Sequence, residues 1–237
     1  MKARKKHLIP VYIILAVMAF IMILPFVWTL LTAFKTQSEA LQVPPRILPS
    51  SWSPRNFESV LQVLPFGKFF YNTFAMIVLR VLGSVFFSAL AAFAFARLEF
   101  PGKKVLFTMV LLQMMVPGQI FILPQYMIVS KLGWLNSIKA LAVPGIVSTF
   151  GTFLLRQFFM GLPRDLEEAA RLDGCNIGQT FLFIMAPLTR SSMVALGIFT
   201  AVFAYKDLMW PLICNRDVMP LSAALAKMQG QYTNNYP

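Results

Sequence analysis

Residues 8–34 read LIPVYIILAVMAFIMILPFVWTLLTAF, a run of 27 residues without a charge. A helix that crosses the hydrocarbon core of a bilayer needs about 20 mostly apolar residues, so this run is long enough to cross. The basic residues before it, Lys2, Arg4, Lys5 and Lys6, look like the start of a signal peptide. The apolar run is too long for one, and no small-residue cleavage site follows it. We therefore predict a retained membrane helix.

The composition of the whole chain points the same way. Of its 237 residues, 58% are hydrophobic and 13% are charged, whereas soluble domains carry about 25% charged residues. These values argue against a soluble enzyme and against disorder. The net charge of +12 fits basic loops that face an anionic membrane leaflet, so no nucleic-acid partner is expected. One histidine and two cysteines beside different apolar segments predict neither a metal site nor a disulfide framework.

Four further apolar segments are candidate membrane spans. They are Phe69–Ala96, Val105–Val129, Ile138–Phe159 and Ser191–Cys214. Proline and glycine interrupt the second and third of these, and Lys206 and Asp207 interrupt the last. Membrane helices tolerate such breaks where neighbouring groups satisfy the freed backbone. The sequence thus predicts an all-α, polytopic membrane protein with five spans.

The spans divide the chain into three parts. Residues 1–34 form the N-terminal tip and the first span, residues 35–68 a proline-rich, non-helical extracytoplasmic loop, and residues 69–237 a membrane core that includes a cytoplasmic loop at 162–187. Basic clusters lie close to membrane ends before the first span and in the turn Arg97–Lys104. Because basic residues accumulate on the cytoplasmic side, both clusters indicate a cytoplasmic N-terminus.

The loop between the fourth and fifth spans is rich in charge. It holds four of the nine acidic residues of the chain, Asp165, Glu167, Glu168 and Asp173. Acids early in a short helix suit its positive end, and Gly174 suits the residue that reverses the chain after it. Glu167 and Arg171 are expected to pair along this helix, and a second short helix is expected over Ile177–Met185. By these residues alone, the loop either only connects two spans or docks a cytoplasmic partner.

The same loop carries a longer pattern. Its elements are Glu168-Ala169-Ala170, Gly174 after three residues, Ile184 after nine more, and Ala186-Pro187 after one more. This pattern is similar to the EAA loop of ABC importer permeases, which reads Glu-Ala-Ala, three residues, Gly, nine residues, Ile, one residue, Leu-Pro. Only Ala186 departs from it. Ala91–Arg97 and Leu132–Ser137 resemble the maltose-type, carbohydrate-uptake branch of that family.

The resemblance implies a type I ABC importer transmembrane domain in a bacterial inner membrane. A second permease subunit, usually non-identical, pairs with it, two ATPase subunits hold ATP and Mg, and an extracytoplasmic binding protein delivers a sugar, polyol or sugar phosphate. The EAA loop resembles the helix that fits a cleft on the ATPase, and the coupling residues would be Glu168, Ala169, Ala170, Asp173, Gly174 and Pro187. This chain has no phosphate-binding GxxxxGK[ST] loop, so it would be no enzyme and hold no cofactor.

Two features depart from the pattern of the family. Near the end of the fifth span, the branch commonly has Trp-Asn-Glu or Trp-Asn-Asp, whereas this sequence has Tyr205-Lys206-Asp207. Family members usually have a sixth span, whereas five are evident here. A non-transporting, truncated scaffold is therefore one alternative. A secondary transporter or channel that acts alone is another, although no internal repeat supports it.

Polar residues within the spans are candidates for a solute pathway. Arg80 lies about eleven residues into the second span and is expected to face protein or water. Lys206 and Asp207, near the outer end of the fifth, either reach the membrane interface or line a vestibule that meets a hydroxyl or a phosphate. Other side chains that either pack inside or bond a sugar are Gln113, Gln119, Gln125, Tyr126 and Tyr205.

Overall fold

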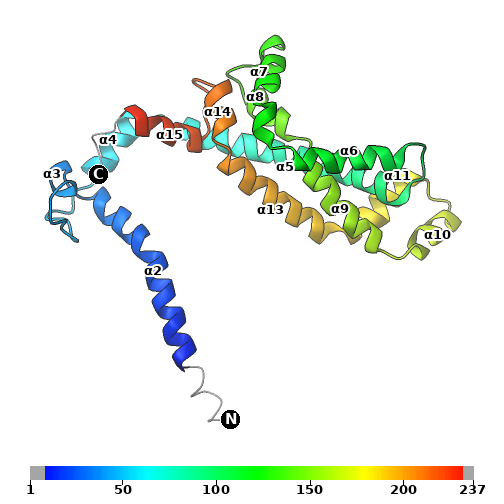
Figure 1. Ribbon diagram of the computed structural model, residues 1–237, viewed down its shortest axis with the longest axis horizontal. Helices are drawn as coiled ribbons and strands as arrows, with labels where there is room; N and C mark the ends of the chain where they lie inside the picture. The colour runs from blue at the N-terminus through cyan, green and yellow to red at the C-terminus, as the bar shows by residue number, and fades with distance from the viewer. Residues whose placement is uncertain (1–8, 232–237) are drawn as a thin grey trace. The chain divides into compact units, whose positions relative to one another are not determined.

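The computed structural model describes residues 9–231, so the N-terminal tip, predicted to be cytoplasmic, lies outside the described residues. The described residues form helices and no strands, which confirms the all-α prediction (Figure 1). Two compact units are distinguished, one made of residues 1–66 and 228–237 and the other of residues 67–227.

The first unit contains α2 (Ile9–Ala33), which matches the first predicted span. Every side chain from Pro10 to Leu30 is exposed, and nearly all of them are apolar. A helix that is apolar on all sides has no polar face to offer to water. Its length and composition are those of a membrane span.

The segment 35–68 is not the non-helical loop that its prolines suggest, because it contains α3 (Gln37–Ala40) and α4 (Arg55–Val63). Thr36 and Glu39 cap α3 reciprocally, each side chain bonding the backbone N–H of the other. Pro54 stands just before α4 rather than inside it, where a missing N–H does no harm. The prolines therefore set the helix boundaries and do not prevent the helices.

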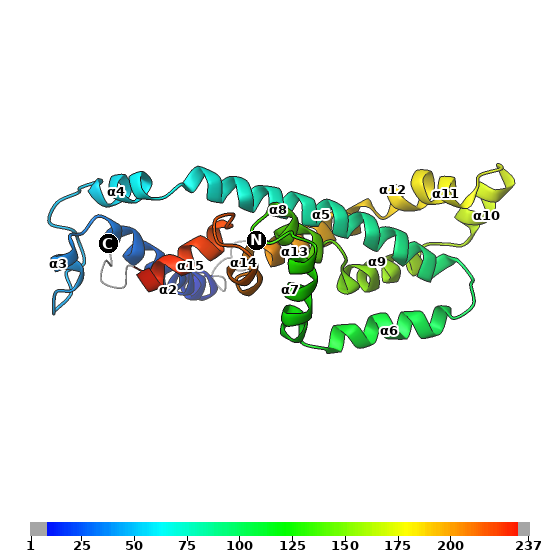
Figure 2. The same ribbon diagram turned by 90° about the horizontal axis from the view of Figure 1, so that it is seen from above.

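The second unit contains the remaining helices, except for the first residue of α5 and the last four of α15. They are α5 (Phe66–Arg97), α6 (Lys103–Met115), α7 (Ile122–Lys131), α8 (Ile138–Ala142), α9 (Thr149–Gly161), α10 (Asp165–Leu172), α11 (Ile177–Gln179), α12 (Ala186–Leu188), α13 (Arg190–Lys206), α14 (Met209–Cys214) and α15 (Leu221–Gln231). Two short 3₁₀ helices, η1 (Gly118–Phe121) and η2 (Val143–Gly145), and one π-helix, η3 (Thr180–Met185), join some of them. α9 packs against both α6 and α13 (Figure 2), and the ring of Phe107 in α6 contacts that of Phe95 in α5.

Bends interrupt two of the five predicted spans. The segment 105–129 is not one helix, because α6 and the part that contains α7 meet at 99°. The break falls at Pro117, which cannot donate to the helical ladder. The fourth predicted span bends by 41° between η2 and α9. Only α2 and α5 could cross a membrane as single helices, and up to five crossings result if each bent pair of described helices counts as one.

The fifth predicted span, Ser191–Cys214, is also not continuous. α13 ends at Lys206, because Asp207 has an extended backbone (φ −66°, ψ 112°), and α14 is a separate helix. At its other end, the segment Ile177–Leu188 meets α13 at 76° and completes the third bent pair.

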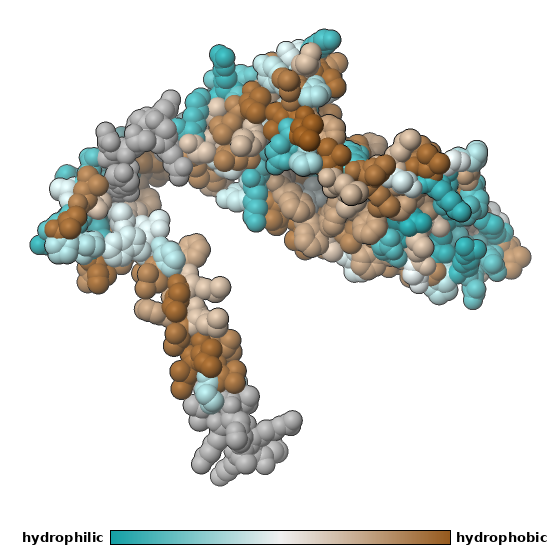
Figure 3. Space-filling view, in the orientation of Figure 1, coloured by the Kyte–Doolittle hydropathy of each residue, from teal (hydrophilic) through white to brown (hydrophobic). Residues whose placement is uncertain are grey.

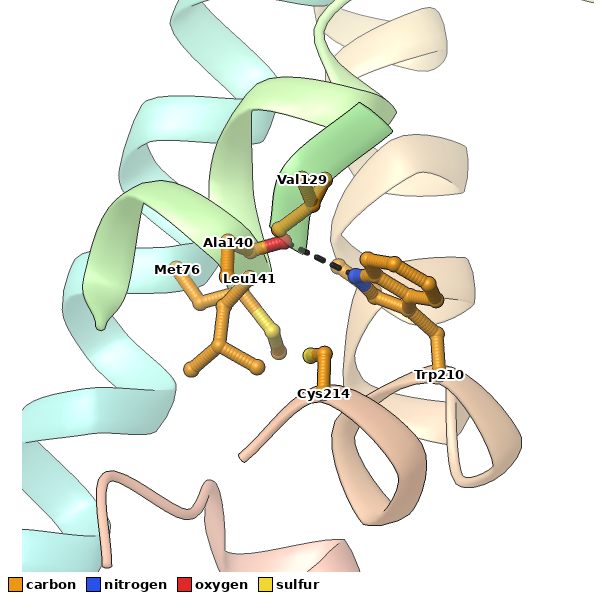
Figure 4. Packing of buried hydrophobic residues seen from close by; sticks show 7 residues of the cluster. Met76, Val129, Ala140, Leu141, Trp210 and Cys214 are labelled. Atoms are coloured by element: carbon orange, nitrogen blue, oxygen red, sulfur yellow. Dashed lines mark hydrogen bonds between the residues drawn. The ribbon is translucent and has the colours of Figure 1, made fainter. Parts of the chain in front are cut away.

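Two apolar clusters hold the second unit together. One gathers residues of α5, α7, α8, α13 and α14 around Met76, Leu141 and Trp210 (Figure 4). The other joins α5, α9, η3 and α13 around Phe93, Phe159 and Leu196. Large apolar side chains also cover the outside of the helices, whereas hydrophilic ones gather at the end that carries α10 (Figure 3). An apolar belt of this kind suits a lipid environment.

Candidate functional site

Arg80 lies buried in α5 and joins three segments of the chain. Its Nε and Nη2 donate to the carbonyl oxygen of Leu141 at 2.8 and 2.6 Å. Its Nη1 lies 2.9 Å from Oδ2 of Asp207. Arg80 was expected to face protein or water, and its guanidinium here contacts protein groups, whereas its partnership with Asp207 was not predicted.

The sequence Pro144-Gly145 makes this arrangement possible. Pro144 has no N–H, so the carbonyl of Ala140 lacks its partner four residues on and accepts instead from Trp210 Nε1 at 2.8 Å (Figure 4). The next carbonyl, that of Leu141, accepts from Arg80. A Cβ on Gly145 would lie only 2.7 Å from Cδ and Nε of Arg80. The break after α8 thus supplies both the acceptor and the room for the guanidinium.

A cavity of about 450 Å³ adjoins this arginine, a size found among small-molecule sites. Its charged and amide-bearing lining residues are Arg80, Gln119, Gln125, Lys206 and Asp207. Arg80 and Asp207 are paired with each other. The side chain of Lys206 is exposed and has neither an ion pair nor a hydrogen bond within residues 9–231. The cavity therefore offers one free cation and two amides to a ligand.

The structure brings only some of the predicted pathway residues together. Arg80, Gln119, Lys206 and Asp207 line the cavity, but Gln113, Tyr126 and Tyr205 do not. Tyr126 packs against the apolar cluster around Met76. Trp210, Pro144 and Gly145 line the cavity without having been predicted. The Pro-Gly pair inside an apolar segment was the signal that could have indicated a break there.

The second candidate site is the charged loop. Its helix α10 ends before Gly174, which has φ +80°, a conformation that favours glycine. After Gly174, Asn176 caps α11, and the chain continues through η3 and α12 into α13. The elbow that the sequence predicts at Gly174 is thus present, and the predicted helix over Ile177–Met185 is one α-turn followed by a π-helical segment.

The predicted coupling residues do not all lie on one face. Glu168, Ala169, Asp173, Gly174 and Pro187 are exposed. Ala170 is buried inside the chain at 2% exposure, and its carbonyl accepts from the N–H of Cys175. Its small size therefore serves internal packing. Leu172 was not among the predicted coupling residues, but its side chain is 90% exposed. The only sign of this in the sequence is that an apolar residue stands between two charged ones, Arg171 and Asp173.

The predicted pair of Glu167 with Arg171 is wrong. Glu167 turns inward, and its Oε1 lies 3.0 Å from Nε of Arg97 at the end of α5. Arg171 is exposed, and an exposed pair contributes little because water screens it. The side chain of Arg97 is 5% exposed, so a carboxylate is needed there to compensate a buried charge.

Comparisons with known proteins agree with this architecture. The family described as "Binding-protein-dependent transport system inner membrane component" matches residues 84–236. The arabinooligosaccharides transport system permease protein AraQ of Halalkalibacterium halodurans is 31% identical over 226 residues, which are 93% of this chain and 81% of that protein. The sn-glycerol-3-phosphate transport system permease protein UgpE of Yersinia enterocolitica is 28% identical over 212 residues, 87% of this chain and 75% of that protein.

A solved structure shares the fold. It is a chain of a bacterial ABC transporter involved in the import of the acidic polysaccharide alginate, with a TM-score of 0.78 and 20% sequence identity. The match covers 100% of this chain and 88% of that one.

Proposed function

Because this chain belongs to the family of binding-protein-dependent transport system inner membrane components, we propose that it is a permease subunit that passes a sugar or a sugar phosphate across the bacterial inner membrane during ATP-driven import. The observation that carries the proposal is the cavity at Arg80, a polar site among helices whose outer faces are apolar. The N-terminus would lie in the cytoplasm, on the same side as α10.

The chemistry of the cavity supports this class of solute. The amides of Gln119 and Gln125 can each donate to and accept from sugar hydroxyls. The ammonium of Lys206 can donate to a hydroxyl and also attract a phosphate or a carboxylate. One relative is named for an arabinooligosaccharide and another for sn-glycerol-3-phosphate, and the same set of groups suits both kinds of solute.

The exposed face of α10 supports a cytoplasmic contact. Glu168, Ala169, Leu172 and Asp173 are all exposed there, and Leu172 presents an apolar side chain to water. We propose that this face binds an ATPase subunit, which would hold ATP and Mg. A second permease subunit and an extracytoplasmic solute-binding protein complete the proposed assembly. This chain carries the solute and performs no chemistry on it.

Purification of the tagged chain from host membranes in mild detergent tests the proposal. Mass spectrometry should find an ATPase with a phosphate-binding loop and a second permease in stoichiometric amounts, and a bound sugar or sugar phosphate. Ala169→Trp should lose the ATPase and keep the second permease. Lys104→Trp, an equally bulky change at another exposed position, should keep both. A wild-type chain that purifies without any ATPase would contradict the proposal.

A further inference from the structure

Arg97, the last residue of α5, ties the charged loop to the membrane helices. Its Nη2 donates to the carbonyl oxygen of Leu162 at 2.6 Å and also to that of Phe159. Both carbonyls belong to the end of α9, where the carbonyl oxygens of a helix lack the N–H donor four residues further on. Its Nε pairs with Glu167 of α10 at 3.0 Å. One guanidinium thus contacts the ends of α9 and α10 from the end of α5.

Glu167 places an acidic side chain on the inner face of α10, and Glu168 places one on its outer face. The side chain of Glu167 is 13% exposed and faces Arg97, whereas Glu168 is exposed to water. Ala170, the other inward residue, packs closely inside the chain. α10 is therefore held from within by an ion pair, while its outer face is free for contact.

A buried pair of this kind resists separation. Removing one partner would leave a charge without compensation in a place with little access to water. A displacement of α10 should therefore move the end of α5 with it, because sliding α10 alone would break the pair.

The same helix reaches the cavity. α5 is continuous from Phe66 to Arg97 and carries Arg80, whose guanidinium binds Leu141 and Asp207 beside the cavity. A continuous helix held at two points transmits a shift along its axis, because its internal hydrogen bonds keep its length fixed.

We propose that Arg97 is a positioning residue that fixes α10 to α5, so that displacement of α10 reaches the solute cavity through α5. The proposal rests on the proposed function, in which α10 contacts the ATPase. Glu167 is the partner through which Arg97 acts, and neither residue contacts solute.

The test uses the assembled complex in proteoliposomes, with ATP and vanadate as the probe. Met209, which lines the cavity, is replaced by cysteine in a chain that carries Cys175→Ser and Cys214→Ser. The rate at which a maleimide labels position 209 is measured with and without ATP and vanadate. With the pair of Arg97 and Glu167 intact, the labelling rate should differ clearly between the samples with and without ATP and vanadate. Glu167→Ala should reduce the change about fivefold or more while ATPase binding and ATP hydrolysis persist.

Two further variants separate positioning from loss of structure. Glu167→Gln keeps a neutral acceptor for Arg97 and should restore part of the response. Asp165→Ala removes another acid of α10, which is exposed, and should respond like the wild type. An unchanged response in Glu167→Ala overturns the proposal. A complete loss of ATPase binding in Glu167→Ala but not in Glu167→Gln also overturns it, since the pair would then serve docking. A wild-type chain that binds no ATPase refutes the proposed function instead.

Discussion

Arg80 and Arg97 lie 17 positions apart on α5, about 26 Å along a helix. Each binds one or two backbone carbonyls near the end of another helix, together with a carboxylate from a third segment. Arg80 binds Leu141 and Asp207, and Arg97 binds the end of α9 and Glu167. Helix C-termini attract cations because their last carbonyls are unpaired. α5 is thus anchored twice by the same kind of contact, once beside the cavity and once beside α10.

The ion pair between Arg80 and Asp207 should affect stability mainly because removal of one partner leaves the other charge uncompensated. Asp207→Ala leaves a largely buried guanidinium without its carboxylate, and we expect a loss of about 3 kcal/mol of stability or more. The double variant Arg80→Met/Asp207→Ala should lose less stability than the sum of the losses in Arg80→Met and Asp207→Ala. Thermal unfolding in detergent measures all four chains. Additive losses would show that the two residues do not interact.

Gly145 should tolerate no side chain, because its Cβ position lies 2.7 Å from Arg80. Gly145→Ala is expected to push the guanidinium from Leu141 and to cost about 1–3 kcal/mol. Gly161→Ala is the matched control, because nothing lies within 4 Å of a Cβ there. Unfolding temperatures of the two variants that are equally close to that of the wild type would contradict this packing.

The apolar helices could be predicted from the sequence because their signal is local. The uncharged run of 27 residues and the observed helix α2 differ by only one residue at each end, and α5 extends the predicted Phe69–Ala96 by three residues and one. A bilayer needs a fixed length of apolar helix, so length alone carries this prediction. Gly174 was also predictable, since the reversal of the chain depends on its own backbone.

The contacts of the ionisable residues could not be predicted. Asp207 is 127 positions from Arg80, and no local pattern links the two residues. Arg171 stands four residues after Glu167, where an ion pair along the helix is favourable, but Glu167 is buried beside Arg97 and pairs with it instead. Pro117 allowed either a mild kink or a full break, and the 99° angle depends on the packing of α7.

Glu39 should make the first unit sensitive to acid. Hydrogen bonds from Ser50, followed by one from the backbone of Thr36, lower the pKa of the Glu39 carboxyl from 4.5 to about 2. A lowered pKa stabilises the folded state above pH 4.5, and this contribution disappears as the pH falls from there toward 2. Glu39→Gln should therefore unfold more easily than the wild type at pH 7, and the difference should shrink below pH 4.5. A difference that is constant from pH 7 to pH 3 would exclude this origin.

Lys206 should discriminate between solutes by charge. It is the cation of the cavity without a partner among residues 9–231. Lys206→Met should reduce uptake of an anionic sugar phosphate about tenfold more than uptake of a neutral sugar, which corresponds to about 1.4 kcal/mol. Lys206→Arg, which keeps the charge, is the control. Equal losses for both solutes in Lys206→Met would remove Lys206 from solute selection.

Gly174 should be needed for the orientation of α10. Its φ of +80° is strained for any residue with a Cβ and most of all for a β-branched one, so Gly174→Val should cost about 1–3 kcal/mol locally and turn α10 from its position. Gly174→Asn is the matched control, because asparagine enters this region more readily. Both changes lie in an exposed loop, so the amount of protein in the membrane should not fall. Co-purification of the ATPase and ATP-driven uptake should fall in Gly174→Val and largely persist in Gly174→Asn. Normal uptake by Gly174→Val at normal membrane levels would contradict the proposed role of this elbow in coupling.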